Sequence, residues 1–265
     1  MGIVTVLYLT FWTVLMYYFK NTNLGHGNAA QFKAVAAVML TQTGLQFSSM
    51  LMCLLTIMLG AGAIASELEN GMIHAIISRP LQRFAYVLGK FLGLFILVVL
   101  YASVLFAALL SIGALFSLST VQALNFWQIM ESWFWYLSVP ATVLCVTLYG
   151  SVVLKVVPNG LLMIFIYILG NIGGMVEMIG KYINNIEVIS SGIFLSLISP
   201  FHTLFTTAER VLLPSVGLAG DVMRGSGGLS GSGQPASGWM YAYIAVYAVG
   251  FVCLAVRKFS RMDIN

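Results

Sequence analysis

The run FLGLFILVVLYASVLFAALLSIGALFSL at residues 91–118 decides the fold class. It contains no charged residue and is apolar on every side, whereas a strand of a membrane barrel would alternate apolar and polar residues over about ten positions. A helix that crosses a bilayer needs about 20 mostly apolar residues, so this run predicts a transmembrane helix. The whole chain of 265 residues is similar, with 60% hydrophobic residues, 8% charged residues and a mean hydropathy of +0.97. Because soluble domains carry about 25% charged residues, the composition excludes a soluble enzyme and indicates an all-α polytopic membrane protein.

Outward from this run, the charged residues divide the chain into six apolar segments, which predict six transmembrane helices in a single transmembrane domain over residues 1–265. The first segment lacks the basic leading region and the small-residue cleavage site of a signal peptide, so we expect it to be a retained span. The predicted spans are residues 2–19, 35–64, 91–118, 134–154, 160–180 and 239–256.

The distribution of lysine and arginine predicts the orientation of these spans. Six spans place both termini on one side, and the segments on that side carry seven basic residues in 40 positions, against five in 88 on the other side. Since cytoplasmic loops are enriched in basic residues, we expect both termini to be cytoplasmic. The expected inside segments are residues 65–90, 155–159 and 257–265, and the expected outside segments are residues 20–34, 119–133 and 181–238.

The long outside segment, 181–238, contains a further apolar stretch at residues 188–198, which Pro200 follows closely. About a dozen residues are few for a span, so the stretch predicts a re-entrant or interfacial helix. A seventh span is the competing interpretation, and it would place the two ends of the chain on opposite sides.

The sequence carries no recognisable catalytic motif. His26, His74 and His202 lie in three separate connecting segments, and the three cysteines fall inside predicted spans without metal-ligand spacing. No phosphate-binding loop of the form GxxxxGK[ST] occurs, so the chain is expected neither to be an enzyme nor to hold a metal or another cofactor. Any ATP would be used by a partner chain. The basic residues flank spans, and we expect no nucleic-acid partner.

The inside loop 65–90 predicts a short amphipathic helix. Ser66 and Glu69 have the spacing of a capping box, and Glu67 and Glu69 place negative charge in the first turn, where the helix dipole favours it. Pro80 disfavours helical geometry at the preceding residue, so we expect the helix to run from Ser66 to Ser78. A helix of this kind can dock on a partner or lie on the lipid surface, and the residues alone leave both alternatives open.

Several segments of the chain resemble permeases of the type-2 ABC exporter superfamily. In these permeases the pattern E-x-E-x-G-T, then S/R-P-x-x-R, then G-K-F recurs between the second and third spans. The chain has ELENGM at 67–72, SRPLQRF at 78–84 and LGKF at 88–91. Two further segments, SPFHTLF at 199–205 and FSRMD at 259–263, resemble the proline-plus-aromatic segment and the F-x-R-x-D ending of short six-span bacterial members. The resemblance extends over nearly the whole chain.

The resemblance implies a bacterial inner-membrane exporter with two permeases, identical or paralogous, and one ATPase subunit beneath each. The helix from Ser66 would be the coupling helix that sits in a cleft of the ATPase. The residues expected to contact the ATPase are Glu67, Glu69, Gly71, Met72, His74, Arg79, Pro80 and Arg83. Two features depart from the pattern, because Met72 replaces the common threonine and the chain starts directly in a span, without the usual cytoplasmic lead-in helix. A different class, a non-transporting membrane anchor or force-transmitting subunit, would use the same coupling helix.

Polar residues in the second span recur at steps of four and three, so they share one face of a helix. These residues are Gln42, Gln46, Ser49, Cys53, Thr56 and Gly60. Uncharged polar side chains in hydrocarbon need partners or water, so the face predicts either a translocation path or dimer seam, or hydrogen bonds between helices of one subunit.

The fifth span carries the remaining candidate residues. Asn171 lies in the glycine-rich stretch 169–174, where the Gly170–Gly174 spacing predicts close helix packing or, alternatively, a hinge. We place the path between the second and fifth spans, with Asn171 as a further lining residue. Glu177 and Lys181 are spaced to pair near the outer end of this span, as an interface pair or as a gate. No ionisable residue is expected at mid-membrane depth, which argues against an ion-coupled carrier.

Overall fold

The computed structural model describes residues 2–21, 29–72, 83–116, 125–212 and 238–261. Every regular element in these ranges is a helix, which confirms the predicted fold class. The helices are α1 (Gly2–Asn21), α2 (Ala29–Ala61), α3 (Ala65–Glu69), α5 (Arg83–Leu115), α7 (Phe126–Val153), α8 (Val156–Ile183), α9 (Ile186–Ile198), α10 (Phe201–Leu212) and α12 (Gly238–Ser260).

Six of these helices are long and apolar enough to cross a membrane: α1, α2, α5, α7, α8 and α12. Each overlaps one predicted span, although α5 begins at Arg83 and α7 at Phe126, before the predicted starts at 91 and 134. Helices α2 and α5 have 33 residues each, which corresponds to about 50 Å at 1.5 Å per residue. Both therefore extend beyond the hydrocarbon layer of about 30 Å.

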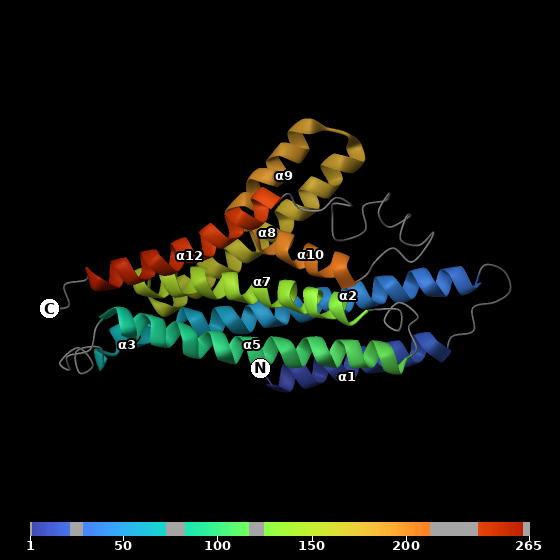
Figure 1. Ribbon diagram of the computed structural model, residues 1–265, viewed down its shortest axis with the longest axis horizontal. Coiled ribbons are helices and arrows are strands. Elements are labelled where there is room, and N and C mark those ends of the chain that lie inside the picture. Colours follow the sequence, from blue (N-terminus) through green and yellow to red (C-terminus); the bar gives the residue numbers. More distant parts are fainter. Residues whose placement is uncertain (1, 22–28, 73–82, 117–124, 213–237, 262–265) are drawn as a thin grey trace.

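Helix α7 is the centre of the bundle, with 72% of its apolar window buried, more than in any other candidate span of the described residues. Helices α2, α5, α10 and α12 pack around it. Figure 1 shows α3, the start of α5 and the end of α12 at the same end of the bundle. Parts of the chain expected on the inside therefore meet at one end of the bundle.

Helix α1 runs beside the second half of α5. Thr5 Oγ1 lies 2.7 Å from Tyr101 Oη, near the middle of α5. At the other end of α1, Lys20 Nζ lies 6.0 Å from the centre of the Phe116 ring. The hydroxyl of Tyr8 also donates to the carbonyl of Gly44 in α2, at 2.6 Å. Helix α1 is thus fixed against two neighbours at the end of the bundle opposite α3.

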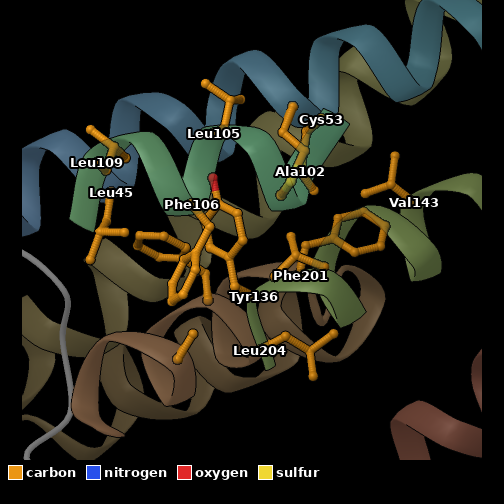
Figure 2. Packing of buried hydrophobic residues seen from close by; sticks show 14 of the residues in the cluster. Leu45, Cys53, Ala102, Leu105, Phe106, Leu109, Tyr136, Val143, Phe201 and Leu204 are labelled. Carbon is orange, nitrogen blue, oxygen red and sulfur yellow. The ribbon is translucent and has the colours of Figure 1, made fainter. Parts of the chain in front are cut away.

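The main core lies between α2, α5, α7 and α10, and Figure 2 shows side chains from all four helices meeting in it. Tyr136 of α7 is almost completely buried, and its ring packs against Phe106 of α5 with the ring centres 5.3 Å apart. Its hydroxyl lies 2.7 Å from Ser48 Oγ of α2. The one strongly polar atom of this side chain therefore has a partner, as burial in an apolar interior requires.

Helices α8 and α9 form a tight hairpin that leans away from the long axis of the bundle (Figure 1). Asn185 caps α9 by accepting from the Glu187 backbone N–H at 3.0 Å. The two helices approach at backbone distance, because a Cβ added at Gly192 would lie 2.6 Å from the backbone nitrogen of Glu177. Only glycine fits there without a shift of one helix.

Helix α9 confirms that the apolar stretch 188–198 is helical. It is followed by α10, which the sequence analysis did not predict, and the two meet at a bend of 99°. The pair fits either a re-entrant segment or a broken seventh span by length and composition. Prolines favour such breaks, since Pro200 has no N–H to continue the ladder of α9.

The predicted helix from Ser66 to Ser78 is wrong at its start and is not continuous, while its predicted end at Ser78 lies outside the described residues. Helix α3 begins at Ala65 without a side-chain cap and ends at Glu69. Ser66 lies inside it, where its backbone N–H already bonds to Gly62 O and its hydroxyl donates to the same carbonyl at 2.5 Å. The turn after α2 leads directly into α3, so no free N–H groups remain for a serine cap. Gly71, with φ of 67°, then interrupts the helix in a conformation that favours glycine.

Candidate functional site

The first candidate region lies at the α3 end of the bundle and is centred on Glu67. Its carboxylate accepts from the hydroxyl of Tyr86 and from Lys90 Nζ, the latter at 2.5 Å. Tyr86 in turn stacks on Phe259 of α12, with ring centres 5.4 Å apart. The first glutamate of the E-x-E pattern and the lysine of the G-K-F pattern are therefore partners, and they join α3, α5 and α12.

Glu69 adds a fourth helix to this end. Its Oε1 accepts from the backbone N–H of Val156, the first residue of α8, at 3.0 Å. A carboxylate is favoured at a helix N-terminus because the free N–H groups and the helix dipole present positive potential. We call the contacts made by Glu67 and Glu69 with Tyr86, Lys90 and Val156 the carboxylate joint.

Asn159 is a polar residue of this end that the sequence analysis missed. It is fully buried in the first turns of α8. Its Nδ2 donates to Ala61 O at 3.4 Å and to Thr147 O at 3.1 Å. Ala61 is the last residue of α2, so its carbonyl has lost the regular helical partner, and Asn159 supplies a donor. A lone asparagine near a predicted span boundary gave no pattern that could have revealed this role.

The residues expected to contact the ATPase divide into two groups. Glu67 and Glu69 come together with α5 and α8 in the carboxylate joint, and Gly71 and Met72 lie exposed just beyond α3. Arg83 is the first residue of α5. His74, Arg79 and Pro80 lie outside the described residues, so their contacts with an ATPase remain predictions.

The second candidate region is a cleft of about 400 Å³ between α2, α8 and α10. Gln42, Gln46 and Asn171, three of the residues predicted to line a path or seam, lie in its wall. Gln46 Nε2 is 3.4 Å from Asn171 Oδ1, and Asn171 Nδ2 donates to Tyr167 O at 2.9 Å. The structure thus brings together polar residues from the second and fifth spans.

Ser49 and Thr56 lie behind the cleft and outside its lining. Both are almost completely buried. The hydroxyl of Thr56 donates to Met52 O, one turn earlier in α2, at 2.8 Å. For Thr56 the observed contact is a hydrogen bond within the subunit, which was the second interpretation of this polar face. The predicted face is therefore polar along its length but open to the cleft only toward Gln42.

Two ionisable residues of α10 also line the cleft, and the sequence analysis assigned neither to a site. Glu209 is 3% exposed and lies 3.5 Å from Gln42 Nε2, while His202 lies on the same helix seven residues earlier. The amphipathic pattern of residues 201–212 could have indicated this helix. Its apolar residues Phe201, Leu204, Phe205, Ala208 and Leu212 are all buried.

The glycines of the fifth span support close packing. Gly170 lies against Ser199, and Gly174 lies against the ring of His202. Both glycines therefore allow α8 to contact the bend between α9 and α10 and the start of α10. The Lys181 side chain lies outside the described positions, so the pairing of Glu177 with Lys181 stays a prediction.

Comparison with known proteins agrees with this architecture. The family described as "ABC-2 family transporter protein" matches residues 2–264, which is nearly the whole chain. A search of the curated proteins found no match. The six candidate spans, the absence of strands from the described residues and the match over almost the full length lead to one conclusion. The chain belongs to the ABC-2 transporter family and is a multi-pass permease of that family.

Proposed function

We propose that the chain is the transmembrane subunit of an ATP-driven exporter, which couples hydrolysis by separate ABC ATPase subunits to movement of a substrate across the membrane. The observation that carries this proposal is the carboxylate joint. It connects the loop that follows α2 to the starts of α5 and α8, through Glu67 with Lys90 and through Glu69 with Val156. A partner that pushes on this loop would therefore act on α5 and on α8, whose first residues lie beside it.

Helix α8 provides the route from this end to the cleft. It begins at Val156, where Glu69 holds it, and continues to Tyr167, Asn171 and Met175 in the cleft wall. Asn159 holds the same helix against α2 and α7 near its start. Displacement of the joint would thus change the spacing between α8 and α2, which form two walls of the cleft.

The proposed assembly contains two permeases, identical or paralogous, two ATPase subunits and surrounding lipid. We place it in the bacterial inner membrane with both termini and the α3 end in the cytoplasm, because the basic residues concentrate in the segments at that end. Cysteine labelling from outside tests this orientation after the native cysteines have been removed. Ser226→Cys should be labelled and Ser78→Cys protected, and the reverse pattern would invert the topology.

A charge exchange tests the coupling proposal. Glu67→Lys should lower ATP turnover by the assembled complex by about tenfold, equivalent to roughly 1.4 kcal/mol, because two ammonium groups replace an ion pair that is only partly exposed. The double variant Glu67→Lys with Lys90→Glu restores opposite charges and should recover most of this loss. Glu131→Lys, an exposed glutamate at the start of α7, is the matched control and should leave turnover unchanged.

The measurements are co-purification of the ATPase with each variant and ATP turnover in lipid. Unchanged association together with unchanged turnover in Glu67→Lys would remove the joint from the mechanism. Loss of association that the double variant does not restore would assign Glu67 to a direct contact with the ATPase. ATP-dependent coupling without movement of any substrate would favour the membrane-anchor or force-transmitting alternative.

A further inference from the structure

A second pocket, of about 580 Å³, lies where α7, α8, α9 and α12 meet, and we call it the lateral groove. Every described residue of its lining is apolar, aromatic or glycine. The hydroxyls of Tyr243 and Tyr247 in the lining already donate to Leu197 O at 2.7 Å and to Ile198 O at 3.1 Å. Water in a cavity needs several polar partners, so the lateral groove is suited to an apolar ligand.

The lateral groove is buried at its floor and exposed at its rim. Val146 and Met163 at the floor are 2% and 5% exposed. Val153 of α7, Leu162 of α8 and Phe194 of α9 at the rim are between 43% and 66% exposed. Because α7 and α8 are candidate spans, the open side of the groove faces the hydrocarbon of the bilayer.

The position of the groove along α8 gives its depth in the membrane. Lys155 lies between α7 and α8, directly after Leu154 of the lining, and so marks the membrane surface. Leu162 and Ile166 of the lining lie about 10 and 17 Å further along, at 1.5 Å per residue. One leaflet of a hydrocarbon layer of about 30 Å has about this depth. The groove therefore matches the length of one lipid tail, whereas a spanning helix would need a groove across both leaflets.

Two lysines give the surface end of the groove a positive charge. Lys155 and Lys258 are both exposed, and Lys258 shares a helix face with Phe251 of the lining, seven residues earlier. Within the part of the chain that the structure describes, neither lysine forms an ion pair. The two glutamates described nearby, Glu67 and Glu69, are engaged in the carboxylate joint. An anionic group at the surface end would therefore be attracted by two ammonium groups.

We propose that the lateral groove binds one anionic phospholipid, with an acyl chain between the rim and the floor and its phosphate group at Lys155 and Lys258. Basic residues beside spans attract anionic headgroups, and the charge at the mouth selects an anionic lipid over a zwitterionic one. The bound chain would lie against Leu197 and Ile198, whose carbonyls hold α12 to the end of α9. This site is distinct from the cleft between α2, α8 and α10.

Native mass spectrometry of the purified full-length permease in detergent tests the headgroup. The titrations use dioleoyl phosphatidylglycerol and dioleoyl phosphatidylcholine, and the measured quantity is the Kd of the first bound lipid. Phosphatidylglycerol should bind the wild type at least tenfold more tightly. The double variant Lys155→Gln with Lys258→Gln should remove this preference. Lys20→Gln, an exposed lysine at the end of α1, is the matched control and should retain it.

A second pair of variants tests the acyl chain. Leu162→Trp fills the groove from its exposed side and should weaken binding of both lipids at least fivefold. Leu161→Trp changes the adjacent residue, which is 64% exposed and outside the described lining, and should bind as the wild type does. Glycerol phosphate, a headgroup without chains, should not displace the lipid.

Three results would overturn the proposal. The first is an equal Kd for the two lipids in the wild type, and the second is an unchanged preference in the double lysine variant. The third is unchanged binding by Leu162→Trp, or displacement by glycerol phosphate, which would leave a phosphate site without a chain in the groove. Since no ATPase is present and no transport is measured, failure here leaves the proposed function and the experiment with Glu67 unaffected.

Discussion

The two candidate regions differ in the kind of polar contact they use. At the carboxylate joint, charged side chains make short contacts, 2.5 Å between Lys90 and Glu67 and 3.0 Å between Val156 and Glu69. In the cleft, the Gln46 amide contacts Asn171 at 3.4 Å and the Gln42 amide contacts the Glu209 carboxylate at 3.5 Å, beside an open space. Charge-assisted bonds are strong when they are short, and the contact between Gln42 and the Glu209 carboxylate is too long to be a strong one. The joint is therefore arranged to keep its geometry, and the cleft is arranged to change its geometry when a ligand enters or α8 moves.

The first prediction compares two asparagines of α8, one in each region. Asn159→Ala should lower the free energy of unfolding by about 1–2 kcal/mol, because it removes two interhelical hydrogen bonds of a fully buried side chain. Asn171→Ala should lower it by less than about 0.5 kcal/mol, since Asn171 is half-buried and its contact with Gln46 is long. Unfolding of both variants in mixed micelles measures the difference.

Equal destabilisation by the two asparagine variants would remove the proposed contrast between a fixed end and an adaptable cleft. A larger effect of Asn171→Ala would reverse it. Asn125→Ala, at the exposed start of α7, is the control. It measures how much an asparagine at a helix start alone contributes to the free energy of unfolding.

The second prediction sharpens the role of the cleft. Gln46→Leu should reduce transport, or substrate-stimulated ATP turnover, by about fivefold, roughly 1 kcal/mol, because it removes an amide from the cleft wall. Its folding yield and assembly should match those of the wild type. A drop in folding yield with unchanged specific activity would instead assign Gln46 to hydrogen bonding within the subunit.

The third prediction has the smallest expected effect and lies outside both regions. Tyr243 of α12 donates to Leu197 O, near the end of α9, at 2.7 Å, and its side chain is exposed. Tyr243→Phe should lower the free energy of unfolding by about 0.5 kcal/mol, the usual contribution of a single hydrogen bond between membrane helices. Tyr17→Phe on α1 is the matched exposed control. If Tyr243→Phe lowered the free energy of unfolding more than Asn159→Ala does, the contact between α12 and α9 would stabilise the fold more than the contacts near the carboxylate joint.

Long apolar runs made the spans predictable, since burial in a bilayer requires about 20 apolar residues whatever the tertiary contacts. Predictions from local sequence patterns failed where two helices join. Ser66 has the pattern of a capping residue, but the chain reaches it from a turn that already satisfies the backbone N–H groups. Helix α10 was missed because its pattern is amphipathic and too short to signal a span.

The candidate site was predictable only where it depends on a pattern within one helix. The helical period placed Gln42 and Gln46 on one face, and the structure finds both in the cleft. The sequence could not show that Glu209, 167 residues after Gln42, folds back to contact it. Nor could it show that Lys90 pairs with Glu67, because that contact depends on how α3 and α5 meet.

The close approach of α8 and α9 has a mechanical consequence. Contacts at Gly173, Gly180 and Gly192 bring a glycine of one helix against the backbone or Cβ atoms of the other, so there is little side-chain slack for the two helices to slide separately. We expect the hairpin to move as one stiff body about its base, where Gly170 lies against Ser199. From this point to Ile183 the helix is about 20 Å long, so a tilt of about 10° displaces the tip by roughly 3 Å. A small rotation at the base of the hairpin would therefore produce a measurable displacement of its tip.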